Sequence, residues 1–530
     1  HVPNIHIRAP KTSVIGTAEF EYFIERNNLR SLIFDGASYE LIKETFVNAR
    51  LTDTLMKRIK IMLKHFRKPI AVRSSGLLED SLMQPFAGIF ETYIIPNTHP
   101  DINERVKQVA NAIKLVYASV YSDLARGYIK AVNYNLEEEK MAVVIQEAVG
   151  NRFGDFFYPH ISGVAQSYNY YPFAHMKPEE GFAVMALGLG KYVVEGEKAY
   201  RFSPKYPTID INQPKDQFRN SQVDFFAVDL RKKEPDLLSG DTAGLIKLPI
   251  SVAEQHGTLK HLASIYDPEN NRITPGLSAN GPRIVNFADI LKYNYIPLAQ
   301  SIETVLDVVK EAMGTPVEIE YAVDLNKDKE MRASFYLLQI KPLIGSLQDY
   351  NVDMEDISPD EIVLYTEKCM GNGLVDYITD VIYIDRNKFD KSHTVEMAAE
   401  VEKFNAQMIK ENMKYLLIGP GRWGTRDRWI GIPVSWPQIS NAKIIVETAL
   451  NDFPLDASSG SHFFHNVTTM NVGYLSLPAN NNRYSIKFDI LDRQPLVGEM
   501  RFFRHVRFSK PLKIRMDGRK QIAVVTYEKL

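Results

Sequence analysis

Residues 71 to 93 are the part of the sequence whose residue types and spacing best fit phosphate chemistry. They run in the order Ala-Val-Arg73-Ser74-Ser75-Gly, Leu-Leu-Glu79-Asp80, Phe-Ala-Gly88 and Glu91-Thr-Tyr. A strand that delivers an arginine into small residues can bind a polyphosphate, because a guanidinium and exposed backbone N–H groups both match phosphate oxygens. An Arg-Ser-Ser turn is more often structural, so the pattern alone leaves both interpretations open.

Two stretches in the last third of the chain also carry residues suited to phosphate chemistry. Residues 417–426 (Leu-Ile-Gly-Pro-Gly-Arg-Trp-Gly-Thr-Arg) lead from an apolar strand into a Gly-rich basic turn, which matches neither a Walker A loop nor a dinucleotide fingerprint. The alternative is a tight structural turn with an exposed Trp423. Residues 458–466 place His462 and His465 beside serines and a glycine.

His462 is a candidate phosphoryl acceptor, because a neutral imidazole nitrogen is nucleophilic near neutral pH. The alternatives are a hydrogen-bonded pair of histidines in a polar cleft, or a metal site formed by His462 and His465. No third metal ligand is apparent near them in the sequence.

Basic residues gather near the end of the chain, between phenylalanines. They are Arg501, Arg504, Arg507, Lys510, Lys513, Arg515, Arg519 and Lys520. A nucleic-acid surface has this composition, but strands with one solvated basic face explain it too. Over the whole chain 63 Lys and Arg nearly balance 65 Asp and Glu, so we expect no nucleic-acid partner.

Length and composition predict a protein of several domains. The chain has 530 residues, more than one core usually organises. Its single cysteine, Cys369, excludes an internal disulfide and favours the cytoplasm. No apolar run reaches the roughly 18 residues of a membrane span, so we expect no membrane partner. Because the sequence begins with His1 and not methionine, we expect that a segment lies upstream.

The elements that must position these residues follow from hydrophobic spacing. Apolar residues at intervals of three and four predict a helix over 101–126. Strands are expected at 141–149, 156–166, 181–187 and 335–340. Residues 346–362 are acidic and poor in apolar side chains, which indicates a linker. Beyond it, 363–530 is expected to form a mixed α/β domain with a helix around 393–412 and a hairpin turn at 516–519.

Several motifs occur in a fixed order along the first two thirds of the chain. After the Arg-Ser-Ser and Phe-Ala-Gly segments come 116–121, 143–149, 162–164, 188–190, 317–321 and 338–342. In this order they resemble the nucleotide-binding domain of the phosphoenolpyruvate synthase and pyruvate phosphate dikinase family. The resemblance covers roughly residues 11–345.

The resemblance implies an α+β fold: a two-subdomain ATP-grasp module, with subdomains at 1–135 and 136–345, followed by the smaller mixed α/β domain. It implies ATP and Mg²⁺ as ligands. Arg73 would contact the ATP phosphates, and the loop from Asp80 to Gly88, with Ser74 before it, would close over them. The remaining residues that it implicates are Gln146 and Glu147 at the adenine or ribose, Glu320 and Gln339 at the metal, and Lys341 at the phosphates.

Three positions depart from the family pattern. Lys341 replaces an arginine, which keeps the positive charge and loses the two-pronged guanidinium. Lys191 stands where the family commonly has glutamate, which inverts the charge. The Gly-Gly-Lys segment of the family has no counterpart before Ala18, so we expect it upstream of His1.

The sequence therefore predicts an ATP-dependent phosphotransferase that passes a phosphoryl group to a histidine and forms AMP, with Arg73, Lys341 and His462 as catalytic residues. The 168 residues after the linker are too few for a pyruvate-binding barrel of roughly 250 residues. The alternative is a regulatory protein that senses ATP without consuming it. The final phosphoryl acceptor and the oligomeric state are left open.

Overall fold

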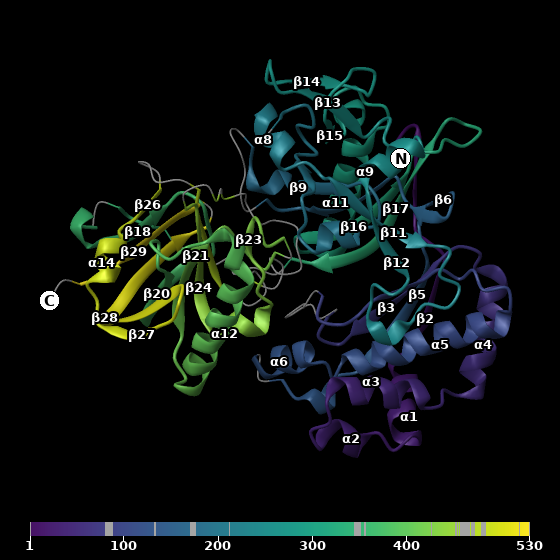
Figure 1. The fold of residues 1–530 in the computed structure, drawn as a ribbon, viewed down its shortest axis with the longest axis horizontal. Helices are drawn as coiled ribbons and strands as arrows, with labels where there is room; N and C mark the ends of the chain where they lie inside the picture. Colours follow the sequence, from purple (N-terminus) through teal and green to yellow (C-terminus); the bar gives the residue numbers. More distant parts are fainter. Residues whose placement is uncertain are drawn as a thin grey trace. The chain divides into compact units, whose positions relative to one another are not determined.

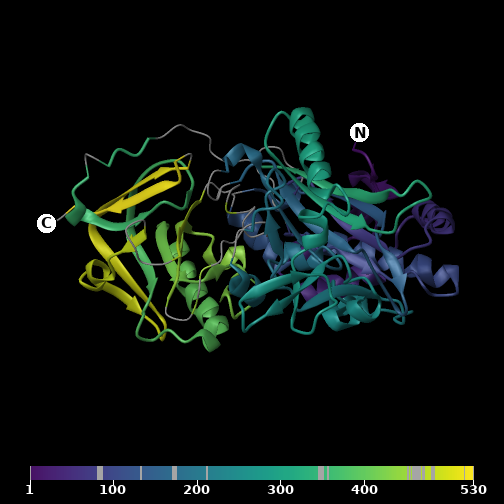
Figure 2. The ribbon, with the colours of Figure 1, turned by 90° about the horizontal axis from the view of Figure 1, so that it is seen from above.

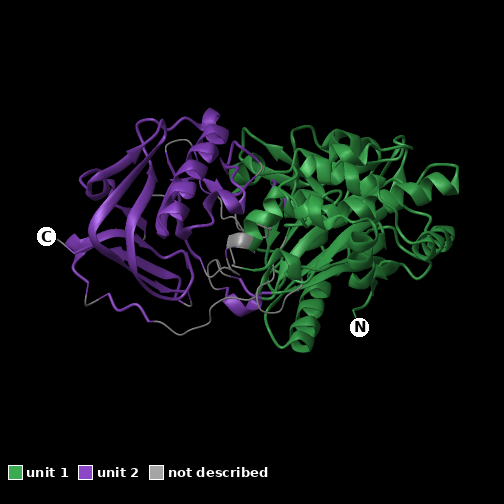
Figure 3. Ribbon diagram, turned by 90° about the horizontal axis from the view of Figure 1, so that it is seen from below, with its two compact units in different colours: residues 1–167, 181–194, 198–342 green, residues 168–180, 195–197, 343–530 purple. Residues whose placement is uncertain are grey.

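The computed structural model describes residues 2–79, 88–131, 134–169, 176–210, 213–343, 351–354, 357–425, 427–450, 453, 455, 467, 472–478, 484–518 and 520–528. The chain divides into two compact units, coloured separately in Figure 3. Unit 1 comprises residues 1–167, 181–194 and 198–342, and unit 2 comprises 168–180, 195–197 and 343–530. Both contain helices and sheets, so the mixed α and β class is confirmed.

Unit 1 holds the elements from β1 to β17. Its helices are α1 (Thr17–Arg26), α2 (Arg30–Phe34), α3 (Tyr39–Asn48), α4 (Asp53–His65), α5 (Ile102–Ser119), α6 (Asp123–Ala131), α7 (Lys191–Val194), α8 (Pro214–Arg219), α9 (Ile250–Gln255), α10 (Ala288–Leu291) and α11 (Leu298–Met313). Its strands are β1 (Ile5–Arg8), β2 (Thr12–Ile15), β3 (Ile70–Gly76), β4 (Tyr93–Ile95), β5 (Met141–Glu147), β6 (Asn151–Phe153), β7 (Phe156–Tyr158), β8 (Ile161–Gln166), β9 (Phe182–Ala186), β10 (Tyr200–Phe202), β11 (Asp224–Asp229), β12 (Leu245–Pro249), β13 (Ala263–Asp267), β14 (Arg272–Pro275), β15 (Arg283–Val285), β16 (Val317–Asp324) and β17 (Ala333–Pro342).

A sheet in the order β2-β5-β3-β4 is covered by the N-terminal helices. Figure 1 shows α1, α3, α4 and α5 gathered on one side of β2, β3 and β5, with α5 in contact with α3, α4 and β3. The predicted helix over 101–126 is split, because α5 ends at Ser119 and α6 starts at Asp123. Ser122 explains the break, since its hydroxyl accepts a hydrogen bond from the Ala125 N–H as a new helix begins.

A second sheet of unit 1 runs in the order β1-β17-β16-β8-β9-β10 and packs against α11. Along β16, Val317, Ile319 and Tyr321 are buried in the same apolar core as Leu306 of α11. Because side chains alternate across a strand, Glu318 and Glu320 face the other side of the sheet. Burial of alternate apolar residues under α11 thus directs two carboxylates to one surface.

Two smaller sheets complete unit 1, in the orders β12-β11-β7-β6 and β14-β13-β15. The expected strand at 156–166 is interrupted, because β7 ends at Tyr158 and β8 starts at Ile161 on the far side of Pro159. Proline has no N–H to give to a strand ladder. The expected strands at 141–149, 181–187 and 335–340 are present as β5, β9 and β17.

Unit 2 is built on a mixed sheet in the order β19-β25-β24-β21-β20-β28-β29-β18-β26, with β27 paired to β28. Figure 2 shows its long β28 beside β29 in yellow. The elements are β18 (Ile362–Thr366), β19 (Cys369–Met370), β20 (Gly373–Ile384), α12 (Thr394–Lys410), β21 (Tyr415–Pro420), β22 (Arg422–Trp423), β23 (Gly431–Ile432), β24 (Ala442–Thr448), β25 (Gly473–Leu477), β26 (Tyr484–Ile486), α14 (Phe488–Asp492), β27 (Leu496–Glu499), β28 (Phe503–Asp517) and β29 (Ile522–Thr526).

The Gly-rich stretch after β21 is a tightly packed turn around a buried tryptophan. Trp423 is 1% exposed and donates its ring N–H to the Val446 carbonyl at 3.1 Å. A Cβ at Gly419 would lie 2.2 Å from the Trp423 ring, so only glycine fits there. The interpretation with an exposed Trp423 is wrong, because this ring fills the space that Gly419 leaves open.

The buried carboxyl of Glu447, at the end of β24, lies beside this turn. It accepts hydrogen bonds from the Tyr474 hydroxyl, from the Trp423 N–H at 3.3 Å and from the Ser476 hydroxyl at 3.3 Å. Burial raises the pKa of Glu447 to about 7, against the opposing effects of Tyr474 and Arg422.

Most of the described basic residues near the C-terminal end are paired with carboxylates within unit 2, and Arg519 lies outside the described residues. Arg504 contacts Asp492 at 3.1 Å, Arg507 contacts Asp380 at 2.8 Å, and Lys510 and Lys513 both contact Glu528. Carboxylates thus neutralise much of this positive charge, which favours the interpretation as a solvated, paired surface over a nucleic-acid surface.

The expected hairpin is formed by β28 and β29, which pair antiparallel, but its turn differs in length. Asp517 pairs with Ile522, so the connection spans residues 518–521 and is longer than the expected two-residue Asp-Gly turn. Among the described residues, no helix combines the length and the apolar character that crossing a membrane requires. The boundaries at 135, 346 and 362 stay predictions, and part of the expected linker lies outside the described residues.

Candidate functional site

Four polar side chains lie side by side on one face of β16 and β17 in unit 1. In the antiparallel register Glu318 pairs with Lys341, and Glu320 pairs with Gln339. Residues directly opposite each other on such strands share a face. The predicted residues Glu320, Gln339 and Lys341 are therefore brought together by strand pairing.

Arg73 reaches this cluster from β3, which belongs to the other sheet. Its guanidinium pairs with the Glu320 carboxylate at 2.8 Å and donates a further hydrogen bond to the Gln339 side-chain oxygen. The side chains of Arg73 and Glu320 are 18% and 14% exposed. The arginine of the Arg-Ser-Ser segment and the Glu320 motif, 247 residues apart, thus form one site.

Lys341 is the second cation of the cluster. Its side chain is 3% exposed, and its ammonium lies 3.1 Å from the Glu320 carboxylate. Burial lowers the pKa of Lys341, but Glu320 and Glu318 outweigh burial, so the pKa stands above its usual value. The lysine that replaces the family arginine therefore keeps its positive charge in this site.

Glu318 and Gln166 belong to the cluster but were missed in the sequence. The Gln166 amide on β8 donates to the Glu318 carboxylate at 2.6 Å. Burial raises the pKa of Glu318 to about 7, opposed by Lys341 and by the Gln166 hydrogen bond. The signal for Glu318 was the alternation with Glu320, since residues two apart share a strand face. Nothing local to Gln166 indicates its role.

Gln146 contacts the cluster through a β-bulge. The pairing of β16 with β17 shifts register between Glu320 and Tyr321, which leaves Leu338 without a partner in the register. The carbonyl of Leu338 accepts a hydrogen bond from the Gln146 side chain at 3.4 Å. Bulges often lie beside active sites because they redirect groups from the ladder, and here the bulge links β5 to β17.

Ser74 and Glu147 lie on the opposite strand face from Arg73 and Gln146, because neighbouring residues in a strand alternate. Ser74 is 6% exposed. The Glu147 carboxylate accepts hydrogen bonds from the backbone N–H groups of Arg67 at 2.6 Å and Lys68 at 3.1 Å. These bonds hold the turn before β3. That Ser74 and Glu147 contact the nucleotide stays a prediction.

The predicted phosphate loop lies mainly outside the described residues, because residues 80–87 are not among them. Gly88 is the first described residue of this loop, with φ +72°. His462 and His465 also lie outside the described residues. Just after the loop, the Glu91 carboxylate accepts hydrogen bonds from the hydroxyls of Tyr39, at 2.9 Å, and Tyr93.

The inverted charge at Lys191 is balanced within unit 1. The ammonium of Lys191 lies 2.5 Å from the Asp241 carboxylate, and its side chain is 14% exposed. Asp241 thus compensates for the departure from the family glutamate.

The oxygen donors of the cluster fit a magnesium ion bound together with phosphates. Arg73 contacts both the Glu320 carboxylate and the Gln339 amide oxygen, so these oxygens converge on one point. Magnesium prefers oxygen ligands and usually takes one or two carboxylates, with waters and phosphates in the other positions. No group of three His, Cys, Asp or Glu side chains that could hold a metal occurs in the described part of the chain. A cation would therefore need phosphate oxygens to complete its shell.

Comparison with known proteins gives one family and several partial relatives. Residues 2–360 match the family described as pyruvate phosphate dikinase, AMP/ATP-binding domain. The chain is 29% identical over 187 residues to an uncharacterized phosphotransferase, YvkC, of Bacillus subtilis, covering 35% of this chain and 20% of that protein. It is 32% identical over 133 residues to a phosphoenolpyruvate synthase of Deinococcus radiodurans, covering 24% of this chain and 14% of that protein. It is also 29% identical over 169 residues to a phosphoenolpyruvate synthase of Aeropyrum pernix, covering 30% of this chain and 18% of that protein. The matched stretches thus span a fifth or less of each relative.

Proposed function

Since this chain belongs to the family of the pyruvate phosphate dikinase AMP/ATP-binding domain, we propose that it is an ATP-dependent phosphotransferase. ATP binds with magnesium at the cluster of Arg73, Glu320, Gln339 and Lys341. The β- and γ-phosphoryl groups then pass together to His462 with release of AMP, and hydrolysis releases the γ-phosphate, so that one phosphoryl group stays on His462. The phosphoenolpyruvate synthases among the relatives support this class of reaction.

The observation that carries the proposal is the pairing of two cations with one carboxylate across two sheets. Arg73 and Lys341 both contact Glu320, at 2.8 and 3.1 Å. Phosphate oxygens entering this site can replace Glu320 as acceptors for both cations, because a charge-assisted hydrogen bond forms equally with phosphate. Glu320 is then released for a metal ligand role.

Glu320 and Gln339 would hold the magnesium ion, which supplies charge neutralisation at the phosphates. The residues of the chain do the positioning: Arg73 and Lys341 orient the polyphosphate, and Gln146 contacts the strand beside it. Catalysis of phosphoryl transfer is mostly positioning and electrostatic stabilisation, which these groups can supply.

In the transfer itself, an imidazole nitrogen of His462 forms a bond to the β-phosphorus while the bond from that phosphorus to the AMP oxygen breaks. Hydrolysis then releases the γ-phosphate from the diphosphoryl group on His462. We place the reaction in the cytoplasm because the chain has a single cysteine.

The products of ATP test the proposal directly. When the purified chain is incubated with ATP and magnesium, we expect AMP and phosphate to form in amounts stoichiometric with the chain, because no acceptor is present to take the phosphoryl group from His462, and chelation of magnesium to stop their formation. Chromatography of the nucleotides measures this. ADP as the only product would contradict the AMP-forming reaction. ATP that is bound but left intact would favour the alternative of an ATP-sensing regulatory protein.

Arg73→Ala should weaken ATP binding by about 1.5 to 3 kcal/mol, the range for losing a hydrogen bond to a charged group. AMP should lose less, because the contact is to the distal phosphates. Calorimetric titration of both nucleotides measures the difference. Arg67→Ala is the matched control, since Arg67 is an exposed arginine six residues away along the chain. Equal losses for ATP and AMP would assign Arg73 a structural role.

A further inference from the structure

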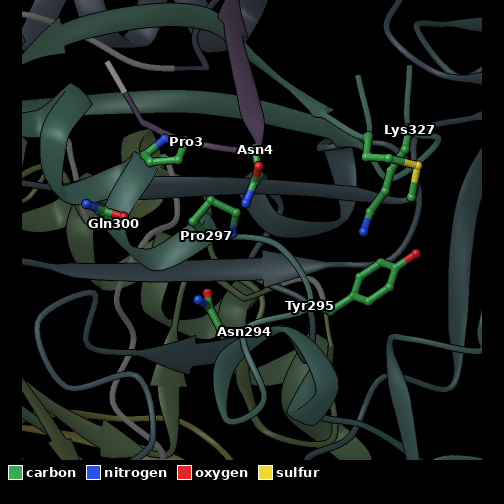
Figure 4. A pocket seen from close by; sticks show the side chains of 8 residues that line it. Pro3, Asn4, Asn294, Tyr295, Pro297, Gln300 and Lys327 are labelled. Atoms are coloured by element: carbon green, nitrogen blue, oxygen red, sulfur yellow. The ribbon is translucent and has the colours of Figure 1, made fainter. Parts of the chain in front are cut away.

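Unit 1 contains a cavity of about 410 Å³ that the proposed function does not use. Three segments line it (Figure 4): the chain before β1, the start of α11 with the loop before it, and the turn between β16 and β17. The lining residues are Pro3, Asn4, Asn294, Tyr295, Pro297, Gln300, Lys327 and Met331. A volume of this size suits a small ligand.

The cavity and the nucleotide cluster lie at opposite ends of β16. Glu318 is the second residue of β16, and the turn that holds Lys327 begins after Asp324, its last residue. At a rise of roughly 3.3 Å per residue, the two ends of this strand are about 20 Å apart. The cavity is therefore a separate site from the nucleotide cluster.

Lys327 supplies a positive charge at the cavity. Within the described ranges no carboxylate lies in ion-pair distance of its ammonium, while the neighbouring Asp328 is shared by His6 at 3.1 Å and Arg332 at 3.2 Å. The ammonium instead lies over the Tyr295 ring, 4.3 Å from its centroid. Figure 4 shows Lys327 directed toward Tyr295. This cation is available to an anionic group.

The Tyr295 ring is held in place by a stacked histidine. His261 stacks on it with the ring centroids 3.9 Å apart and the planes at 12°. His261 is in turn fixed by Asp289 at 3.1 Å, and the Tyr295 N–H donates to the Asp289 carbonyl at 2.9 Å. Because the ring is fixed, the lysine over it is positioned before a ligand arrives, which lowers the entropy cost of binding.

Three carboxamides complete the polar lining, those of Asn4, Asn294 and Gln300. In the part of the chain that the structure describes, none of the three makes a side-chain hydrogen bond within the protein. Each carboxamide offers both donors and an acceptor. Groups of this kind can bind hydroxyl, amino and carboxylate groups on a ligand.

We propose that this cavity binds a small hydroxycarboxylate or aminocarboxylate. The single ammonium among the described lining residues, that of Lys327, balances the charge of one carboxylate. A phosphate dianion would carry a second negative charge that none of these lining residues neutralises. The carboxamides bind the hydroxyl or amino group, and Pro3, Pro297 and Met331 cover the carbon chain. At about 30 Å³ for each water-sized group, the cavity has room for up to about a dozen non-hydrogen atoms, so smaller acids such as lactate, glycerate and serine fit within it.

Lysine acylation on the full chain tests the site with lactate, glycerate and serine as probes. We expect at least one of them to slow the acylation of Lys327 by about tenfold, as for a charged hydrogen bond. Lys329, exposed on the same turn, is read in the same peptide by mass spectrometry and should not change. Lactamide, the uncharged analogue of lactate, should give no protection.

Two variants separate the site from the nucleotide cluster. Calorimetry with the protecting probe should show about tenfold weaker binding for Lys327→Met, and no change for Lys329→Met or Arg73→Ala. Retained ATP binding by Lys327→Met shows that this variant is folded. The proposal is wrong if none of the three probes protects Lys327, if Lys327→Met binds the probe unchanged, or if inorganic phosphate protects better than the carboxylates.

Discussion

His462→Ala should abolish the acid-labile label that the chain acquires from ATP labelled at the β-phosphorus. The label resides on an imidazole nitrogen in the proposed reaction, and phosphohistidine is released by acid. With the acceptor removed, no other residue takes its place, so the expected loss is complete. Gel autoradiography before and after acid treatment measures it.

His465→Ala is the internal control, because it removes a second histidine three residues away and leaves the acceptor in place. It should retain the label. Both variants should still bind ATP with the affinity of the unmodified chain, since the nucleotide cluster is formed by other residues. Label that survives in both variants would show that neither histidine is the acceptor. If the unmodified chain acquires no label, the result favours the alternative, a regulatory protein that senses ATP without consuming it.

Glu320→Ala should destabilise unit 1 by about 3 kcal/mol, the lower end of the cost of breaking a buried ion pair. Arg73 and Lys341 both rely on this carboxylate, and the ammonium of Lys341 is almost fully enclosed. Removing the acceptor leaves two partly buried positive charges that repel each other. The unfolding midpoint in urea without nucleotide measures the loss of stability.

Glu320→Gln separates charge from hydrogen bonding in the same place. It keeps an acceptor for Arg73 and Lys341, so it should be less destabilising than alanine, while magnesium-dependent ATP binding should be lost in both variants. Glu311→Ala, at an exposed position of α11, controls for loss of a surface carboxylate. If Glu320→Ala were as stable as Glu311→Ala, the ion-pair cluster would have no part in holding β3 against β16.

The resemblance to the family predicted Glu320, Gln339 and Lys341 as site residues. The structure adds the reason that they lie together, because antiparallel pairing of β16 with β17 places them on one face. Arg73 lies on another sheet, so no local pattern indicates that it meets Glu320. The family motif order supplied that link, and the 2.8 Å contact agrees with it.

The misses have physical causes that local patterns do not reveal. The apolar spacing of 101–126 continues through the break at Ser122, because hydroxyl capping does not disturb the periodicity. Gln166 acquires its role only because β8 pairs with β16. Trp423 is buried, contrary to the expectation, because Gly419 has no Cβ to occupy the space that the ring fills. The roles of Ser74, Gly88, Gln146 and Glu147 toward ATP stay predictions.

Between about pH 4.5 and 7, the enclosed carboxyl of Glu447 takes up a proton when unit 2 folds. Its pKa is about 7 in the folded chain, against a reference value of 4.5. Between these two values the folded state holds a proton that the unfolded chain has released. The resulting stability is fully present below about pH 4.5 and is lost as the pH rises through 7, by about 3 kcal/mol. The turn around Trp423 is therefore held most firmly in mildly acidic solution, and alkaline conditions place a negative charge beneath it.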